Sequence, residues 1–262
     1  MTLEQKKSKK LFFLIALPRS GNTLLASILN QNPAIACTGN SITLEIMKKL
    51  YLLKGDETFQ NFPDHRSLDN VLNAVFSQYY KHWPQHVIID RGPVMTPGNI
   101  ELMKKHFKPG FKCIVLLRDI LDVLASYIKW YTENPDAFPN KQGFTDEAKL
   151  NYLLEEEGAI YKDTIAIQNS YNYPGTCHYL KYNDLVSKPE TEIKKIYEFM
   201  EEPYYPHYFE NLKQIKINGI GYDDRIVGKN MHTIKSVIKK ENNPYVKRVP
   251  EEIIKKYESI RF

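Results

Sequence analysis

Short apolar segments alternate with amphipathic ones along the chain. Continuous apolar runs, typical of parallel strands buried on both faces, cover Leu11–Leu17, His86–Asp90, Lys112–Leu117 and Cys177–Tyr182. Helical spacing of apolar residues follows or separates them at Gly21–Asn30, Leu68–Lys81, the segment after Arg118, Thr145 to about Ser170, and Glu190–Glu201. Strands that alternate with helices predict the α/β class, with a central parallel sheet flanked by helices on both faces.

The length and composition fit one domain. The chain has 262 residues, of which 42% are hydrophobic and 26% charged, so we expect a single domain over 1–262 with a flexible basic tail at 1–10. Basic residues before Leu11–Leu17 imitate a secretion signal, but no small-residue cleavage site follows and a turn comes next. No run is long enough to span a membrane. The three scattered cysteines suggest a reducing, cytoplasmic setting and no disulfide framework.

The net charge of +5 points to a small anionic ligand. Basic residues do not alternate with aromatic ones after the first ten positions, which argues against nucleic acid as a partner. Arginine is scarce, so each one suggests a planar, bidentate contact that lysine cannot make. Arg19, Arg91 and Arg118 all stand just past the ends of predicted strands. Open α/β sheets bind their ligands at that edge.

The segment Ala16-Leu-Pro-Arg-Ser-Gly-Asn-Thr23 joins the first strand to the first helix. Compared with the nucleotide-binding pattern G-x-x-x-x-G-K-[ST], it keeps the second glycine, Gly21, and Thr23. Asn22 replaces the lysine, and Arg19 supplies a cation from within the turn. Backbone N–H groups and the helix N-terminus can still bind a phosphate or sulfate. The alternative is a tight strand-to-helix turn with a threonine cap.

Arg118 and Ser126 form a second pattern, eight residues apart. On a straight helix this spacing is ~12 Å, too far for one phosphate. The two side chains can meet if Arg118 lies in the loop before the helix. The alternative is that Arg118 pairs with Asp119 or Asp122 and that Ser126 bonds its own backbone.

These segments together resemble the sulfotransferase family. Pro18 to Thr23 is similar to its 5′-phosphosulfate loop, and Arg118 to Ser126, followed by Tyr127, is similar to its 3′-phosphate motif. Tyr182-Asn183-Asp184-Leu185 with Lys188-Pro189-Glu190 resembles a later motif, and Gly228 to Thr233 resembles the C-terminal loop that covers the cofactor in bacterial members. The motifs keep their order from about residue 11 to 235.

The resemblance implies a P-loop-like three-layer sandwich that transfers a sulfuryl group to a hydroxyl or amine acceptor. It implies 3′-phosphoadenosine 5′-phosphosulfate (PAPS) as donor, 3′-phosphoadenosine 5′-phosphate (PAP) as product, and no metal requirement. Arg19, Ser20, Gly21, Asn22 and Thr23 would hold the phosphosulfate, Arg118 and Ser126 the 3′-phosphate, and Tyr182 the adenine, while Lys229 would close over the 3′-phosphate. The missing lysine is then explained, because PAPS has no γ-phosphate.

The catalytic groups are less well defined by the resemblance. Arg91 stands where relatives place a lysine near the transferring sulfonate; the alternative is a surface arginine that pairs with Asp90. Relatives place a histidine or glutamate as general base, but Gly92-Pro93 and Cys37–Ser41 offer neither. Glu45 and Asp90 are therefore the candidate bases, since burial would raise the pKa of either carboxyl.

The sequence leaves two alternative functions and the identity of the acceptor open. A small-molecule kinase with a degenerate phosphate loop, or a non-catalytic nucleotide-binding module, are the alternatives to sulfuryl transfer. The acceptor would be a small molecule or a peptide hydroxyl, chosen by the loops at 41–62, 131–145 and 203–222.

Overall fold

The apolar runs form a five-stranded, all-parallel sheet in the computed structural model, which describes residues 9–107, 110–138, 140–156, 158–225, 227–239 and 242–257. Residues 1–8 of the predicted basic tail lie outside the described residues. The strands are β1 (Lys10–Ala16), β2 (Ile35–Cys37), β3 (Val87–Arg91), β4 (Lys112–Leu117) and β5 (Cys177–Lys181), in the order β2-β3-β1-β4-β5. The predicted α/β class is confirmed.

The strand register brings the three predicted arginine positions to one edge. Leu14 of β1 pairs with Arg91 of β3, and Ala16 pairs with Leu116 of β4. The strands are parallel, so their carboxyl ends lie side by side. Arg19 and Arg118, which follow β1 and β4, therefore emerge at the same edge as Arg91.

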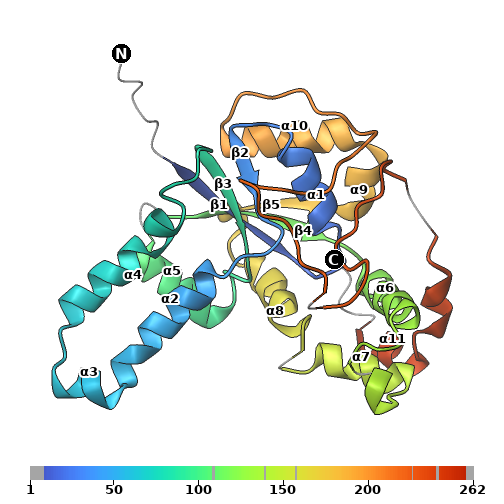
Figure 1. Ribbon diagram of the computed structural model, residues 1–262, viewed down its shortest axis with the longest axis horizontal. Helices are drawn as coiled ribbons and strands as arrows, with labels where there is room; N and C mark the ends of the chain where they lie inside the picture. The colour runs from blue at the N-terminus through green and yellow to red at the C-terminus, as the bar shows by residue number, and fades with distance from the viewer. Residues whose placement is uncertain are drawn as a thin grey trace.

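Helices cover both faces of the sheet (Figure 1). On one face lie α1 (Asn22–Leu29), α9 (Tyr182–Ser187) and α10 (Pro189–Met200), and on the other lie α5 (Pro97–His106) and α8 (Tyr161–Ser170). Beside β4, α6 (Ile120–Glu133) packs with α7 (Asp146–Leu154) and α11 (Glu251–Tyr257). The arrangement is the predicted three-layer sandwich.

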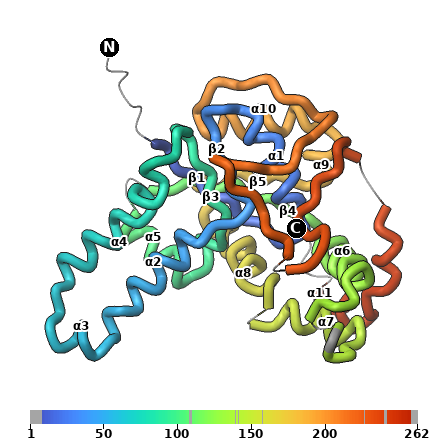
Figure 2. The backbone as a smooth tube through the Cα atoms, in the orientation of Figure 1, coloured from blue at the N-terminus to red at the C-terminus, as the bar shows by residue number. Residues whose placement is uncertain are grey.

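A helical arm extends from the sandwich, as the tube in Figure 2 shows. It consists of α2 (Thr43–Leu52), α3 (Glu57–Asn61) and α4 (His65–Tyr79), and α2 packs along α4. Short 3-10 turns occur at η1 (Leu53–Gly55), η2 (Asn140–Gln142), η3 (Pro174–Thr176) and η4 (Pro244–Arg248). No helix among the described residues is long and apolar enough to cross a membrane.

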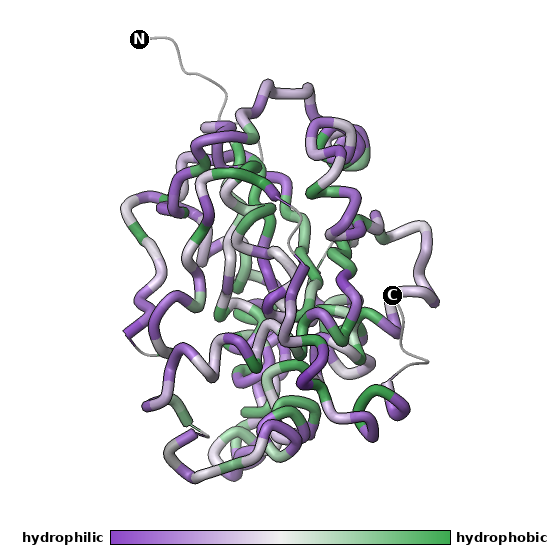
Figure 3. Tube along the Cα trace, turned by 90° about the vertical axis from the view of Figure 1, so that its right-hand side faces the viewer, coloured by the Kyte–Doolittle hydropathy of each residue, from purple (hydrophilic) through white to green (hydrophobic). Residues whose placement is uncertain are grey.

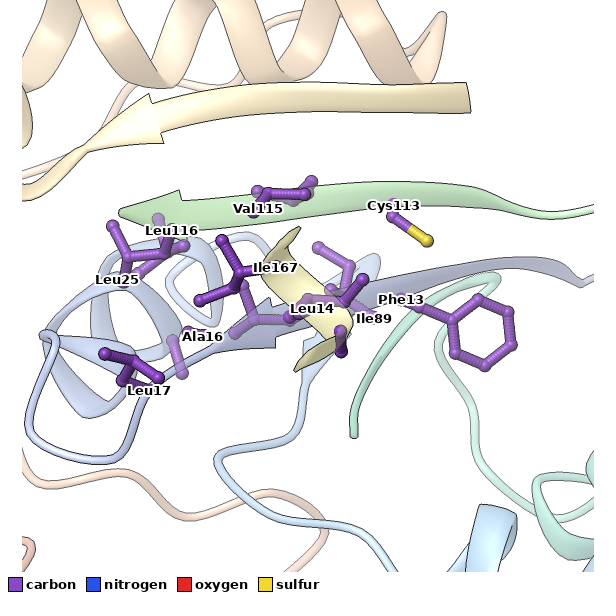
Figure 4. Close-up of a cluster of buried hydrophobic side chains, with 14 of the residues drawn as sticks. Phe13, Leu14, Ala16, Leu17, Leu25, Ile89, Cys113, Val115, Leu116 and Ile167 are labelled. Carbon is purple, nitrogen blue, oxygen red and sulfur yellow. The ribbon is translucent and has the colours of Figure 1, made fainter. Parts of the chain in front are cut away.

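The core lies between the sheet and its two helical layers. Leu25 of α1 and Ile167 of α8 are fully buried against strand residues such as Leu14 and Val115 (Figure 4). In Figure 3, hydrophobic stretches of the chain run through the middle of the trace, and hydrophilic stretches are frequent along its outline. Burial of apolar surface on both faces is what stabilises the strands.

The prediction of one long helix from Thr145 to about Ser170 is wrong. The segment forms α7 and α8, separated by a turn in which Ile160 N–H donates to the Leu153 carbonyl at 3.1 Å. Gly158 permits this turn, because a Cβ there would lie 2.3 Å from the Leu153 oxygen. The three-residue strand β2, and helices α2 and α5, were not predicted.

The C-terminal segment is loop-rich, as its proline and tyrosine content predicts. In the described part of 203–239 the only strand pairings are the isolated bridges Glu210–Val237 and Ile217–Ile220. The segment runs from α10 across the front of the sheet toward α6 (Figure 1). It therefore passes over the edge where the arginines emerge.

Candidate active site

The turn between β1 and α1 depends on two left-handed backbone conformations. Arg19 has φ 66° and Gly21 has φ 99°, and the Ser20 N–H donates to the Leu17 carbonyl at 3.2 Å. A Cβ at Gly21 would lie 2.7 Å from the Tyr182 ring. Glycine is required here for its conformation and for the close approach of that ring.

The N-terminus of α1 has no side-chain cap. Gly21 is the N-cap residue, so the alternative of a threonine cap is wrong. Asn22, which replaces the usual lysine, donates its side-chain amide to the Leu17 carbonyl at 3.2 Å and so helps to hold the turn. The first N–H groups of α1 remain directed out of the turn, where the helix dipole favours an anion.

The two predicted phosphate-binding patterns converge on Arg19. Its Nε donates to Ser126 Oγ at 3.1 Å, and Arg118 Nη1 donates to the Arg19 carbonyl at 2.6 Å. Arg118 precedes α6, so the loop position that the spacing required is observed. Asp119 caps α6 by accepting from Leu121 N at 2.8 Å. The alternative, in which Ser126 bonds only its own backbone, is wrong.

Tyr182 lies against both parts of this cluster. The Arg118 guanidinium carbon is 4.4 Å from the centroid of the Tyr182 ring, which is a cation–π contact. The same ring closes on Gly21. Tyr182 is the first residue of α9, directly after β5. The structure thus brings together residues from three separate segments that the sequence predicted as one site.

The C-terminal segment closes one side of the cluster. Arg19 Nη1 donates to the Met231 carbonyl. The backbone of Lys229 is fixed by Trp130 Nε1, which donates to its carbonyl at 3.0 Å, and by Asn134, whose Oδ1 accepts from its N–H at 2.7 Å. The Lys229 side chain is exposed. The sequence did not predict a role for Trp130 of α6 or for Asn134, which directly follows α6, because nothing in the sequence distinguishes them from packing residues.

Arg91 forms an ion pair that the sequence analysis did not anticipate. Its Nη2 lies 2.5 Å from Asp163 Oδ2 on α8 and donates to the Ala16 carbonyl at 2.9 Å. The alternative pairing of its side chain with Asp90 is therefore wrong. Burial raises the pKa of Asp163, and the Arg91 guanidinium opposes that rise. Asp163 holds the guanidinium beside the end of β1.

The two candidate bases occupy opposite environments. Asp90 is buried, and its Oδ2 accepts hydrogen bonds from Thr43 at 2.5 Å, Tyr80 at 2.6 Å and Ser41 at 3.0 Å. Burial raises the pKa of Asp90 to about 6, against the opposing effect of these hydrogen bonds. Glu45 is exposed in the first turn of α2. The structure does not bring Glu45 to the hydroxyl cluster around Asp90.

A further group lies on the C-terminal segment. The His232 ring is stacked on Tyr222 at 3.8 Å between centroids, and its Nδ1 is 2.5 Å from Asp224 Oδ1. The Tyr222 hydroxyl is buried beside the Thr23 side chain, and a Cβ at Gly39 would overlap it. Burial raises the pKa of Tyr222 to about 12, so it is a hydrogen-bond donor at neutral pH. Only contacts between distant segments reveal this group.

Comparisons with known proteins agree with these motifs. The model of the sulfotransferase family matches residues 12–206. The chain is 24% identical over 205 residues to a Caenorhabditis briggsae protein named "Putative protein-tyrosine sulfotransferase", covering 75% of this chain and 67% of that protein. It is also 28% identical over 220 residues to an uncharacterized Aquifex aeolicus protein, covering 79% of this chain. The match spans only 27% of the length of the Aquifex protein.

A solved structure shows the same fold. The mouse sulfotransferase SULT7A1 complexed with PAP has a TM-score of 0.55 with this chain at 15% identity. The alignment covers 96% of this chain and 82% of the mouse protein. The expected family resemblance is confirmed, because the family model covers residues 12–206, which contain three of the four motifs. The chain belongs to the sulfotransferase family.

Proposed function

We propose that this protein is a PAPS-dependent sulfotransferase that sulfates a hydroxyl or amine acceptor. The observation that carries the proposal is the convergence of Arg118, Arg19 and Ser126 beside the uncapped N-terminus of α1. This arrangement supplies two separate places for anionic groups. PAPS, when bound, supplies the sulfuryl group and carries a 3′-phosphate that ordinary nucleotides lack. Family membership favours this reaction over the kinase and the non-catalytic module.

Each predicted donor residue keeps its role in the proposal. The 5′-phosphosulfate would be held by the turn residues Arg19, Ser20, Gly21, Asn22 and Thr23. The 3′-phosphate would be held by Arg118 and Ser126, with Lys229 closing over it, and Tyr182 would contact the adenine. Asn22 contributes chiefly by shaping the turn, since its amide bonds the Leu17 carbonyl. The backbone N–H groups then provide most of the turn's donors.

Polar atoms in the cluster fit an anionic ligand. Within the described part of the chain, Ser20 Oγ, Arg118 Nε and Arg91 Nε are buried and have no hydrogen-bond partner. A buried donor without a partner costs free energy. Three such donors around one sheet edge support a ligand that is rich in acceptor oxygens. Burial lowers the pKa of Arg19, but an arginine side chain stays charged at neutral pH.

Arg91 is proposed as the second cation near the transferring group. The Asp163 carboxylate and the Ala16 carbonyl fix its guanidinium at the carboxyl edge of the sheet. A positioned cation stabilises negative charge that spreads over the sulfuryl oxygens during transfer. Of the two candidate bases, the hydroxyl contacts of Asp90 favour it over the exposed Glu45. We propose that no metal takes part, because the arginines supply the positive charge.

Thermal-shift titration tests the donor proposal. PAP without Mg²⁺ should stabilise the protein by about 2.7 kcal/mol at a concentration of 100 times Kd. Mg·ATP at the same concentration serves as the matched comparison, since it has a γ-phosphate and no 3′-phosphate. Stronger stabilisation by Mg·ATP than by PAP would contradict the proposal and favour a kinase.

The remaining proposals concern setting and partners. All three cysteines, Cys37, Cys113 and Cys177, are buried and free, which supports the predicted reducing, cytoplasmic setting. We propose a small-molecule or peptide hydroxyl as acceptor and no role for nucleic acid. Incubation of the protein with labelled PAPS and candidate small-molecule and peptide acceptors, followed by mass spectrometry, tests which class of acceptor is sulfated.

A further inference from the structure

A cavity of about 290 Å³ lies next to the proposed donor site. Three parts of the chain form it: the segment after β2, the end of α4 with the following turn, and the C-terminal segment. Its lining includes Thr38, Gly39, Ser41, Tyr80, Trp83 and Tyr222. Pockets for small molecules have volumes of about 300–1,000 Å³, so this cavity accommodates one ring with a short substituent.

The inner end of the cavity touches the site already described. Thr38 accepts a hydrogen bond from the Arg91 backbone N–H at 3.0 Å. The Tyr222 hydroxyl passes over Gly39 and lies beside Thr23, the last residue of the phosphate turn. Tyr222 therefore belongs both to the cavity wall and to the surroundings of the turn. A molecule in the cavity would have one end at the carboxyl edge of the sheet.

The walls of the cavity are aromatic and apolar. Tyr80 makes edge contacts with Tyr79 at 4.9 Å and with Trp83 at 4.8 Å between ring centroids. Isoleucines at 215, 217 and 220 face them from the C-terminal segment. Aromatic walls of this kind favour a flat ring, which can stack or make edge contacts.

The charges around the cavity disfavour an anionic ligand. None of its lining residues is lysine, arginine or histidine, and its one acidic residue, Asp223, is paired with Arg225 at 2.7 Å. A carboxylate or sulfate on the ligand would lose its hydration there without gaining a cation. The ring must therefore carry neutral substituents.

Two hydroxyls of the wall connect the cavity to a buried carboxylate. Ser41 and Tyr80 both line the cavity, and both donate to Asp90 Oδ2, at 3.0 and 2.6 Å. Ser41 Oγ also accepts from the Thr43 backbone N–H at 3.2 Å. A hydroxyl oxygen has two lone pairs, so one is left to accept a proton from the cavity side. Asp90 itself is buried and acts only through these hydroxyls.

We propose that this cavity is the acceptor site and that it takes an uncharged, ring-bearing alcohol or phenol, with Ser41 receiving the acceptor's proton and Asp90 receiving the proton of Ser41. The inference rests on the proposed function. The acceptor oxygen forms a bond to the donor sulfur while the S–O bond to the 5′-phosphate breaks, its electron pair remaining on the phosphate oxygen. The acceptor proton moves to Ser41 Oγ as the Ser41 proton moves to Asp90 Oδ2.

A second cavity, of about 440 Å³, does not compete for this role. It is lined by Phe111 and Thr176, which precede β4 and β5. It therefore lies at the amino-terminal ends of these strands, on the edge of the sheet opposite the phosphate turn.

Binding measurements on the PAP-saturated protein test the ligand class. We expect 4-ethylphenol to bind at least about tenfold more tightly than 4-hydroxyphenylacetate, in which a carboxylate replaces the terminal methyl group of the ethyl substituent. Trp83→Ala should weaken 4-ethylphenol by about tenfold. Phe62→Ala, which removes an aromatic side chain that is 82% exposed, should leave its affinity unchanged. Equal affinity for the two probes, or no effect of Trp83→Ala, would overturn the assignment of the cavity.

Two hydroxyl substitutions test the proton path. Ser41→Ala should lower kcat by about a hundredfold and leave the affinity for 4-ethylphenol within about twofold. Thr43→Val removes a donor to Asp90 and a contact with Ser41 Oγ at 2.9 Å. It keeps Ser41 Oγ, the atom that receives the proton, and Thr43 does not line the cavity, so its effect on kcat should be at least about tenfold smaller. Equal losses in the two variants would overturn the path through Ser41. Failure of PAP to bind would instead contradict the proposed donor, so the two failures are distinguishable.

Discussion

The donor and acceptor sides of this active site are built in different ways. The proposed donor side stands on strand ends: Arg19 and Arg118 follow β1 and β4, and the turn between β1 and α1 has positive φ angles at Arg19 and Gly21. The proposed acceptor cavity is formed by the end of α4 with its following turn, the segment after β2 and the C-terminal segment, so most of its wall lies outside the sheet. In the proposed function the sheet edge would therefore hold the donor, and connecting segments, which tolerate more change than strands do, would surround the acceptor.

Asp163→Ala should have the largest effect, because it removes one partner of a buried ion pair at the edge of the sheet. Arg91 is part of the site edge, and removal of its partner would leave a buried, unpaired guanidinium. Loss of one partner of a buried ion pair costs about 3–5 kcal/mol. Urea unfolding should detect this loss in the free energy of unfolding. Asp163→Asn, which keeps a hydrogen-bond acceptor, should cost less, and a loss below about 1 kcal/mol in Asp163→Ala would contradict a structural role for the pair.

Arg118→Ala should separate the two sides of the comparison. Hydrogen bonds to a charged group contribute about 1.5–3 kcal/mol, so the variant should bind PAP about tenfold to a hundredfold more weakly. Binding of AMP, which lacks the 3′-phosphate, should change much less. Titration calorimetry with both nucleotides measures the difference. Affinity for 4-ethylphenol should stay the same, and equal losses for PAP and AMP would remove Arg118 from the 3′-phosphate site.

The donor side could be predicted from the sequence because its residues follow signals of local structure. Gly21 marks a turn between a strand and a helix, and Arg118 marks the end of an apolar run. Parallel strands then force such residues to one edge. The spacing of Arg118 and Ser126 alone left two geometries open, and the start of α6 at Ile120 decides between them.

The acceptor side could be predicted only coarsely. The proposed cavity includes residues of two of the three expected acceptor loops, 41–62 and 203–222, but not of 131–145, and the contacts within it join segments with no common pattern. Asp163 lies in a stretch that looked like the middle of one long helix, and its partner Arg91 is 72 residues away. Tyr222 is one of 18 tyrosines, and only its approach to Gly39 distinguishes it. Ser41 gains its meaning from Asp90, 49 residues later. Pairings of this kind depend on tertiary packing that periodicity does not encode.

The pH profile offers the finest test of the acceptor side, with an expected change of about tenfold per pH unit in its sloping part. Burial raises the pKa of Asp90 to about 6, and the carboxylate form is the one that can receive a proton. The value of kcat should therefore rise with pH through about 6 and level off above it. The groups that face Asp90 are Ser41, Thr43, Tyr80 and Cys37.

Stability should change with pH in the opposite direction. The pKa of Asp90 is higher in the folded protein than its ordinary value of 3.8, so the protonated carboxyl favours the folded state. This stabilisation is fully present below pH 3.8 and is lost as pH rises through about 6. Burial raises the pKa of Cys37 and of Tyr80, so neither titrates in this range. Asp90→Asn keeps an acceptor for the hydroxyls and should remove both the rise in kcat and the change in unfolding free energy. If kcat of Asp90→Asn still rises through pH 6, a group other than Asp90 must titrate there. That result would contradict the assignment of Asp90 as the base.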